Sequence, residues 1–307
     1  KTFRHLRHDP NNPNSLSMDD VWTMIEDREK NIWIATYGAG LDKYEPATGK
    51  FTHYTHKKED PYSISSNNIL ALMEDSEGRI WVGTDGSGLC ELNVTTEKFR
   101  RFVHQPSGNS ISNNSINGIY EDPFRNLWIS TDEGLNSWDR KTNIFSSYFT
   151  SDGLPHNSTL GILPDEAGNI WVSTFGGITK FNPRTKKFHN YGVSDGLQAK
   201  QFGYGYCKTK EGMMYFGGKN GFNAFYPSKV RQVSFDPPLV VTDFKISNQS
   251  IGIARNDEDP SPLKQSLLHI REIVVPYQQS LFSFEFASLN FTKVDKKNYS
   301  YKLEGYD

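Results

Sequence analysis

Asp75-Ser-Glu-Gly-Arg-Ile-Trp-Val-Gly-Thr84 is the stretch that decides the fold, because its pattern recurs along the chain. Each copy is built around an aromatic residue, and the five centres are Trp33, Trp81, Trp128, Trp171 and Tyr215. These centres are 48, 47, 43 and 44 residues apart. A repeat of this period is typical of a β-propeller, in which each repeat forms one blade.

Every repeat contains the same succession of short segments. An apolar run comes first, and a turn beginning with Asp follows, six residues ahead of the Trp in the first four repeats. After the Trp segment, a loop containing Gly leads to a third segment, and a segment headed by Phe, such as 51–54 or 99–102, ends the repeat. Asp and Gly at the first and fourth positions of 75–78 favour a tight turn. The pattern predicts blades of four strands with the Trp side chains packed between blades.

The composition agrees with an all-β protein. Phe, Trp and Tyr make up 13% of the 307 residues, and 25 Gly and 15 Pro supply turns. The 34 Lys and Arg nearly balance the 36 Asp and Glu, and no basic run is present, so we expect no nucleic acid as a partner. The chain contains no apolar stretch of about 18 residues, and we expect no direct membrane insertion of this region.

We predict two domains, propeller blades over 1–229 and the N-terminal part of an immunoglobulin-like β-sandwich over 230–307. The period ends after Tyr226-Pro227, and further strands are expected at 239–246, 273–275, 280–288 and around Tyr299–Leu303. Phe alternates with polar residues from 282 to 286, which indicates a strand with one buried face. Such a sandwich needs about seven strands. We therefore expect a truncated sandwich, and a chain cut from a longer protein.

The two ends of the repeat region leave two arrangements open. Phe3-Arg-His-Leu6 has the pattern of a fourth strand without a blade before it, whereas the fifth repeat has no fourth strand after it. The ends either pair and close a five-bladed ring, which removes both open edges, or belong to a larger ring.

Residues 63–89 resemble the two-component regulator propeller repeat, and 281–287 with 299–307 resemble the sandwich domain named for its three tyrosines. Together they are similar to the extracytoplasmic sensor of hybrid two-component systems, found mainly in Bacteroidetes. The resemblance implies a periplasmic location, a seven-bladed ring, a membrane span and histidine kinase elsewhere in the protein, and a homodimer. It also implies recognition of an oligosaccharide released from a complex glycan, with control of polysaccharide-utilisation genes.

The candidate ligand-binding residues are those that change between repeats while the frame stays constant. Directly after the Trp segments stand Tyr37, Asp85, Asp132, Phe175 and Lys219; ahead of the first segments stand Asp20, Asn68 and His156. Both sets are expected at one face of the propeller. Aromatic faces cover the C–H patches of sugars, and amides or carboxylates pair with hydroxyls. Each residue taken alone also fits an ordinary turn.

Two alternatives to the sensor remain open at this stage. One is a scaffold that binds protein or peptide, since propeller faces often do so. The other is an enzyme similar to the streptogramin lyases, which needs converging acid–base groups or metal ligands. His156 is the histidine expected at the propeller face, and it has no evident partner in the sequence. We therefore assign no catalytic residue, no metal ligand and no cofactor.

Overall fold

The computed structural model describes residues 3, 5–230, 238–256, 258–279 and 281–288. Contacts between residues divide the chain into two units, Lys1–Val230 and Arg231–Asp307, which are described separately below. None of the helices in the described ranges is long and apolar enough to cross a membrane. These helices are short 3-10 turns, namely η1 (Thr150–Asp152), η2 (Val193–Asp195), η3 (Pro227–Lys229) and η4 (Tyr277–Gln279).

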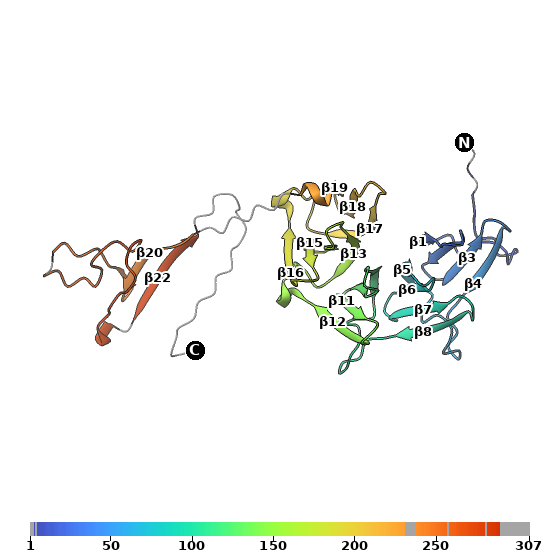
Figure 1. Cartoon of the computed structure of the whole chain (residues 1–307), viewed down its shortest axis with the longest axis horizontal. Coiled ribbons are helices and arrows are strands. Elements are labelled where there is room, and N and C mark those ends of the chain that lie inside the picture. The colour runs from blue at the N-terminus through green and yellow to red at the C-terminus, as the bar shows by residue number, and fades with distance from the viewer. Residues whose placement is uncertain (1–2, 4, 231–237, 257, 280, 289–307) are drawn as a thin grey trace. The chain divides into compact units, whose positions relative to one another are not determined.

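The first unit consists of antiparallel sheets that follow one another along the chain, as the prediction of an all-β propeller requires (Figure 1). Within the described residues of this unit, four sheets have four strands and the fifth has three, and each sheet is one blade. Blade 1 contains β1 (Val21–Glu26), β2 (Ile32–Thr36), β3 (Leu41–Glu45) and β4 (Lys50–Tyr54); blade 2 contains β5 (Ile69–Glu74), β6 (Ile80–Thr84), β7 (Leu89–Asn93) and β8 (Lys98–Phe102). Blade 3 contains β9 (Ile116–Glu121), β10 (Leu127–Thr131), β11 (Gly134–Asp139) and β12 (Ile144–Tyr148); blade 4 contains β13 (Thr159–Pro164), β14 (Ile170–Thr174), β15 (Gly177–Asn182) and β16 (Lys187–Tyr191). Blade 5 contains β17 (Phe202–Lys208), β18 (Met214–Gly218) and β19 (Gly221–Phe225).

The Asp turn and the Trp form one local unit in blades 1 to 4. In blade 1 the carboxylate of Asp27 accepts hydrogen bonds from the Trp33 indole N–H at 2.8 Å and from the Asn31 backbone N–H at 2.8 Å. The corresponding indole bonds to Asp75, Asp122 and Asp165 measure 2.9, 3.1 and 3.0 Å. A buried indole N–H needs such a partner. The same Asp therefore closes the turn and fixes the Trp ring.

The Trp side chains pack between blades, as the sequence predicts. Trp81 of blade 2 is buried and lies in one cluster with Ile116, Ile129 and Trp138 of blade 3. The inner strands also meet closely. Gly161 of β13 leaves room for Tyr206 of β17, because a Cβ at this glycine would lie 2.5 Å from the tyrosine ring.

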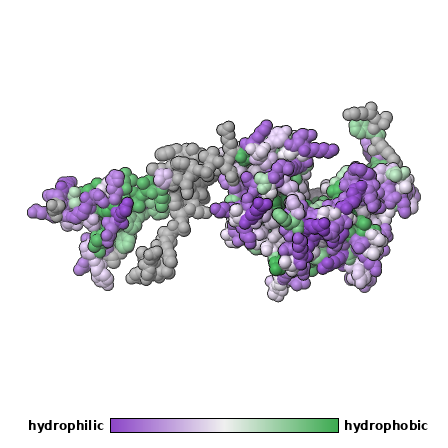
Figure 2. Space-filling view, viewed as in Figure 1, coloured by the Kyte–Doolittle hydropathy of each residue, from purple (hydrophilic) through white to green (hydrophobic). Residues whose placement is uncertain are grey.

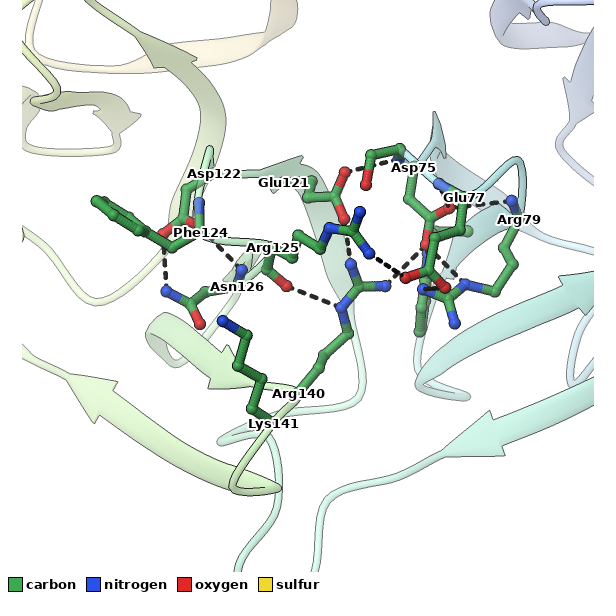
Figure 3. A network of polar contacts seen from close by, with 12 residues as sticks. Asp75, Glu77, Arg79, Glu121, Asp122, Phe124, Arg125, Asn126, Arg140 and Lys141 are labelled. Atoms are coloured by element: carbon green, nitrogen blue, oxygen red, sulfur yellow. Dashed lines mark hydrogen bonds and ion pairs between the residues drawn. The ribbon is translucent and has the colours of Figure 1, made fainter.

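Charged side chains join neighbouring blades at the end of the strands where the Asp turns lie. Figure 3 shows Arg140 of blade 3 between Asp75 of blade 2, at 2.7 Å, and Glu121 of its own blade. Arg125 of blade 3 lies 2.7 Å from Glu77 of blade 2. Similar pairs join blade 1 to blade 2 and blade 4 to blade 5, through Arg28–Glu74 and Glu166–Lys208, both at 2.6 Å.

Strand β1 is less buried than the first strands of blades 2 to 4. Its residues alternate between half-buried and exposed, with Trp22 39% and Met24 59% exposed. The first strands of blades 2 to 4 begin with three or more buried residues. The physical reason is that, among the described residues, blades 2 to 4 have a neighbouring blade on each side, whereas blade 1 makes extensive contacts with blade 2 alone.

The second unit contains a three-stranded antiparallel sheet of order β21-β20-β22, with β20 (Leu239–Ile246), β21 (Gln249–Ser250) and β22 (Phe282–Ser288). The prediction of strands at 239–246 and 280–288 is confirmed, the latter beginning at Phe282. The prediction of a strand at 273–275 is wrong: Ile273 and Val275 lie in a loop and pack as single side chains against the buried cluster of Phe244, Ile246 and Leu263. The prediction of a buried Phe face on this strand is wrong, because no second sheet of described residues in this unit covers it: Phe282, Phe284 and Phe286 are 46%, 45% and 40% exposed. Figure 2 shows hydrophobic residues along this sheet. The strand expected near Tyr299 lies outside the described residues, and the immunoglobulin-like sandwich stays a prediction.

Candidate ligand-binding face

The two sets of candidate residues lie at the same end of the blades. In blade 1 the Tyr37 N–H donates to the carbonyl of Asp20 at 3.1 Å, and in blade 2 the Asp85 N–H donates to the carbonyl of Asn68 at 3.0 Å. The same bond joins Phe175 to Ser158 in blade 4 and Lys219 to Gln201 in blade 5, at 3.4 and 3.2 Å. In each case the residue after the second strand bonds to the residue just ahead of the first strand. This repeated bond fixes both loops at one face, which we call the loop face.

Tyr37 and Asp85 connect blades 1 and 2 at the loop face. The Tyr37 hydroxyl donates to Asp85 Oδ2 at 2.8 Å, and Ser115 of blade 3 donates to Asp85 Oδ1 at 3.3 Å. The backbone of Tyr37 also forms an isolated antiparallel bridge with Asn68. The hydrogen bond to the Asp85 carboxylate and its negative charge raise the pKa of Tyr37, so the hydroxyl stays protonated and donating at neutral pH.

Asp132 forms a second polar group, between blades 3 and 4. Its Oδ1 accepts hydrogen bonds from the Asn117 side-chain amide at 2.9 Å and from the Ser158 hydroxyl at 3.5 Å. Asn117 is 2% exposed, and its Oδ1 has no hydrogen-bond partner among the described residues. The group therefore contains a carboxylate that is oriented by its neighbours and a buried oxygen that can still accept a hydrogen bond.

Two aromatic residues that the sequence reading missed stand next to these groups. The Trp22 ring lies 5.6 Å from that of Tyr37 and 5.3 Å from that of Tyr204. Trp22 and Tyr204 are each 39% exposed although they belong to the first strands of blades 1 and 5. Burial, followed by the charges of Asp132 and Asp85, raises the pKa of Tyr204. Tyr204, which contacts Trp22, is thus within electrostatic reach of both carboxylates.

The remaining candidates contribute less to this arrangement. His156 and Phe175 of blade 4 contact each other with ring centroids 5.8 Å apart, and both are exposed. The Ser158 backbone N–H donates to His156 Nδ1 at 2.9 Å, so Nδ1 is the accepting nitrogen of this ring. Asp20 and Lys219 are exposed and are placed at the loop face by their backbone bonds.

A pair resembling part of a catalytic triad occurs elsewhere and has a structural explanation. His53 Nδ1 lies 2.7 Å from Asp42 Oδ1 and its Nε2 lies 3.0 Å from the carbonyl of Pro13, between the third and fourth strands of blade 1. The matching strand pair holds Cys90 with Arg101 in blade 2 and Asn136 with Ser147 in blade 3. There Arg101 donates to the Ser63 carbonyl at 2.7 Å and the Asn136 amide donates to the Ser112 hydroxyl at 2.9 Å, so in blades 1 to 3 this position ties the loop before the blade to its outer strands. In the described ranges no group of three or more His, Cys, Asp or Glu is arranged to hold a metal ion.

Comparison with known protein families identifies the repeats. The two-component regulator propeller repeat matches residues 15–38, 63–86, 110–133 and 142–176. Each match contains the start of a blade and its Trp strand, and blade 5 is not matched.

Individual relatives agree with this match. A histidine kinase P4 of Formosa agariphila is 31% identical over 91 residues, which is 30% of this chain and 6% of the kinase. The extracellular domain of a hybrid two-component system from B. thetaiotaomicron superposes with a TM-score of 0.67 at 28% identity, over 94% of this chain and 37% of that domain. This chain therefore spans well under half of either relative.

One enzyme shares the fold. Virginiamycin B lyase from Staphylococcus aureus has a TM-score of 0.53 and 14% identity, over 68% of this chain and 67% of the lyase. At this identity the likeness extends to the propeller fold alone.

Proposed function

From the premise that this chain carries two-component regulator propeller repeats, we propose that it is the periplasmic ligand-sensing domain of a hybrid two-component histidine kinase. Its ligand is an oligosaccharide derived from a complex glycan, and its signal passes through the membrane to regulate polysaccharide-utilisation genes. The domain is non-catalytic and acts in a homodimer, in which ligand binding changes the placement of the two sandwich domains.

The observation that carries the proposal is the composition of the loop face. Trp22 and Tyr204 present aromatic surface to solvent, beside the Tyr37–Asp85 pair. Aromatic rings bind the C–H faces of a sugar ring, and carboxylates accept hydrogen bonds from its hydroxyls. The polar groups already hold one another in place, so binding orders few side chains and costs little conformational entropy.

Isothermal titration calorimetry against a panel of plant, host and microbial oligosaccharides tests this proposal, using the complete extracytoplasmic region. One glycan class is expected to bind. Trp22→Ala and Tyr37→Ala should weaken binding by about tenfold or more, because each removes stacking surface of roughly 1–2 kcal/mol. Tyr37→Phe keeps the ring and removes the bond to Asp85, which separates stacking from polar contacts.

Phe124→Ala is the matched control, because Phe124 is 64% exposed and lies in the turn at the opposite end of blade 3. Affinity that survives both Ala variants at the loop face contradicts this site while keeping a glycan sensor. Failure of every glycan to bind contradicts the proposed ligand class and favours a peptide or protein partner.

A further inference from the structure

His53 of β4 lies where the outer strands of blade 1 meet the loop that precedes the blade. It stands opposite Asp42 of β3, and the same register position holds Cys90↔Arg101, Asn136↔Ser147 and Thr179↔Asn190 in blades 2 to 4. In blade 4 the Asn190 amide donates to the Gly153 carbonyl at 2.9 Å, so there too this position holds the preceding loop. Of these residues, His53 is the one that changes charge near neutral pH.

Both ring nitrogens of His53 face acceptors. Nδ1 lies 2.7 Å from Asp42 Oδ1, and Nε2 lies 3.0 Å from the carbonyl oxygen of Pro13. The ring also stacks on Phe51, with centroids 6.2 Å apart. A carboxylate and a carbonyl only accept hydrogen bonds, and a neutral imidazole has one N–H whereas the imidazolium has two. Both bonds therefore form together only when His53 is protonated.

The Asp42 carboxylate is shared by the ring and the loop. Its side chain is fully buried, and its Oδ2 accepts the Ser17 backbone N–H at 2.8 Å. A buried carboxylate is costly without a counter-charge. Burial lowers the pKa of His53, but the hydrogen bonds to Asp42 and Pro13 and the charge of Asp42 outweigh it and raise this pKa above its ordinary value. The His53 imidazolium is thus the counter-charge of Asp42.

The other titratable groups around the ring belong to the loop. His8 and Asp9 line the same cavity as His53. His8 Nδ1 lies 2.8 Å from the Leu16 carbonyl, a single acceptor that a neutral ring satisfies. The Asp9 carboxylate accepts a backbone N–H within the loop at 2.9 Å. Among the described residues, the charge that acts directly on the His53 ring is therefore that of Asp42.

We propose that His53 is a proton-operated latch that holds residues 9–17, the entry loop, on blade 1. With the proton bound, the ring joins Asp42 to Pro13 and the entry loop is closed. When pH rises and the proton leaves, the remaining N–H stays with the buried carboxylate, because leaving that acceptor unpaired costs more. The Nε2 lone pair then repels the Pro13 carbonyl, and the entry loop opens. The loop continues into Asp20 and Trp22, so pH acts through it on the loop face of blade 1.

Hydrogen exchange at two backbone amides of the full chain tests the latch. The Phe51 N–H of β4 donates to Asn14 Oδ1 of the entry loop at 2.7 Å. The equivalent Phe99 N–H of β8 donates at 2.8 Å to a carbonyl in the loop that Arg101 holds, and Arg101 keeps its charge at any working pH. Because a raised pKa gives stability that is complete below the unfolded pKa of about 6.5, the protection factor of Phe51 should be constant below about pH 6. It should fall about tenfold as pH rises through the pKa of His53, whereas that of Phe99 stays constant.

Variants of His53 separate the charge from the shape of the side chain. His53→Arg places in blade 1 the permanent charge that blade 2 has, so Phe51 should stay protected and the dependence on pH should disappear. His53→Ala should leave Phe51 poorly protected at every pH. His8→Gln is the matched control and should keep the pH dependence, because the contact of His8 needs no charge.

Equal protection of Phe51 at about pH 5.5 and about pH 8.5 overturns the latch, as does an unchanged pH dependence in His53→Arg. An NMR titration that gives His53 a pKa below about 6.5 also overturns it. The Tyr37 amide, which donates to the Asp20 carbonyl at 3.1 Å, should follow Phe51. Protection of Tyr37 that does not change with pH overturns the link to the loop face, while the ligand proposed for that face is judged by its own titrations.

Discussion

Asp27 shows how much of each blade depends on a single side chain. Its two carboxylate oxygens accept hydrogen bonds from the backbone N–H groups of Glu29 and Asn31, from the Asn31 amide and from the Trp33 indole. Asp27→Ala leaves the buried indole N–H without a partner and should lower the free energy of unfolding by about 1–3 kcal/mol. Urea unfolding followed by Trp fluorescence measures this, and Glu29→Ala, an exposed residue of the same turn, should change little.

The same carboxylates make stability depend on pH. Burial alone raises the pKa of Asp27 and Asp165, but hydrogen bonds from Asn31 and Trp33, and from Asn169 and Trp171, outweigh it and lower both pKa values. A lowered pKa in the folded state gives stability that is complete above the unfolded pKa of about 3.9 and is lost as pH falls through the folded pKa. Between about pH 5 and about pH 2 we expect the urea midpoint to fall, most steeply below about pH 4. A midpoint that stays constant or rises over this acidic range contradicts this assignment.

Gly161 tests the packing of the inner strands. A Cβ at Gly161 would lie 2.5 Å from the ring of Tyr206, whereas a Cβ at Gly203 meets its nearest atom at 4.0 Å. Gly161→Ala should therefore destabilise the protein by about 1–3 kcal/mol through overpacking, and Gly203→Ala, the matched control in β17, should not. Comparison of the two midpoints in urea decides this.

At the level of strands and blades, burial decides which charged contact matters. Arg140 is 12% exposed and contacts Asp75 and Glu121, whereas the Arg125–Glu77 pair is 58% and 43% exposed. Removing one partner of a buried pair is costly, but exposed pairs contribute about 0–1 kcal/mol. Arg140→Ala should destabilise the protein more than Arg125→Ala does. Equal urea midpoints for the two variants would contradict a structural role for Arg140.

The strands of the propeller are predictable because their determinants are local. The Asp, the Trp six residues later and the following Gly fix two strands and a turn within one short stretch, and each copy repeats the information. Strand 273–275 was predicted wrongly because apolar side chains also pack from loops, as Ile273 and Val275 do against the cluster around Phe244. The exposure of β1 was not predictable, since it depends on the absence of extensive contacts outside blade 2.

For the whole molecule, the repeat placed the candidate residues at one face but did not show which of them meet. The Tyr37–Asp85 bond joins equivalent positions of adjacent blades and follows from the repeat. The Trp22–Tyr204 contact joins blades 1 and 5, so it depends on how the blades curve around their centre. No local pattern encodes that curvature, and Trp22 and Tyr204 were missed for this reason.

Each complete sheet is made from four strands that are consecutive in the sequence, so the order of synthesis matters. The four strands of blade 1 have all their strand partners once the chain has emerged from Val21 to Tyr54, and no later strand of the described residues joins that sheet. Contacts between residues that are close together in the sequence form quickly during folding. The Trp of each blade, however, is covered only when the next blade arrives, as Trp81 is covered by residues of blade 3. A nascent chain thus exposes an apolar blade face at its growing end. Each newly made blade covers the apolar face of the blade before it and exposes its own apolar face.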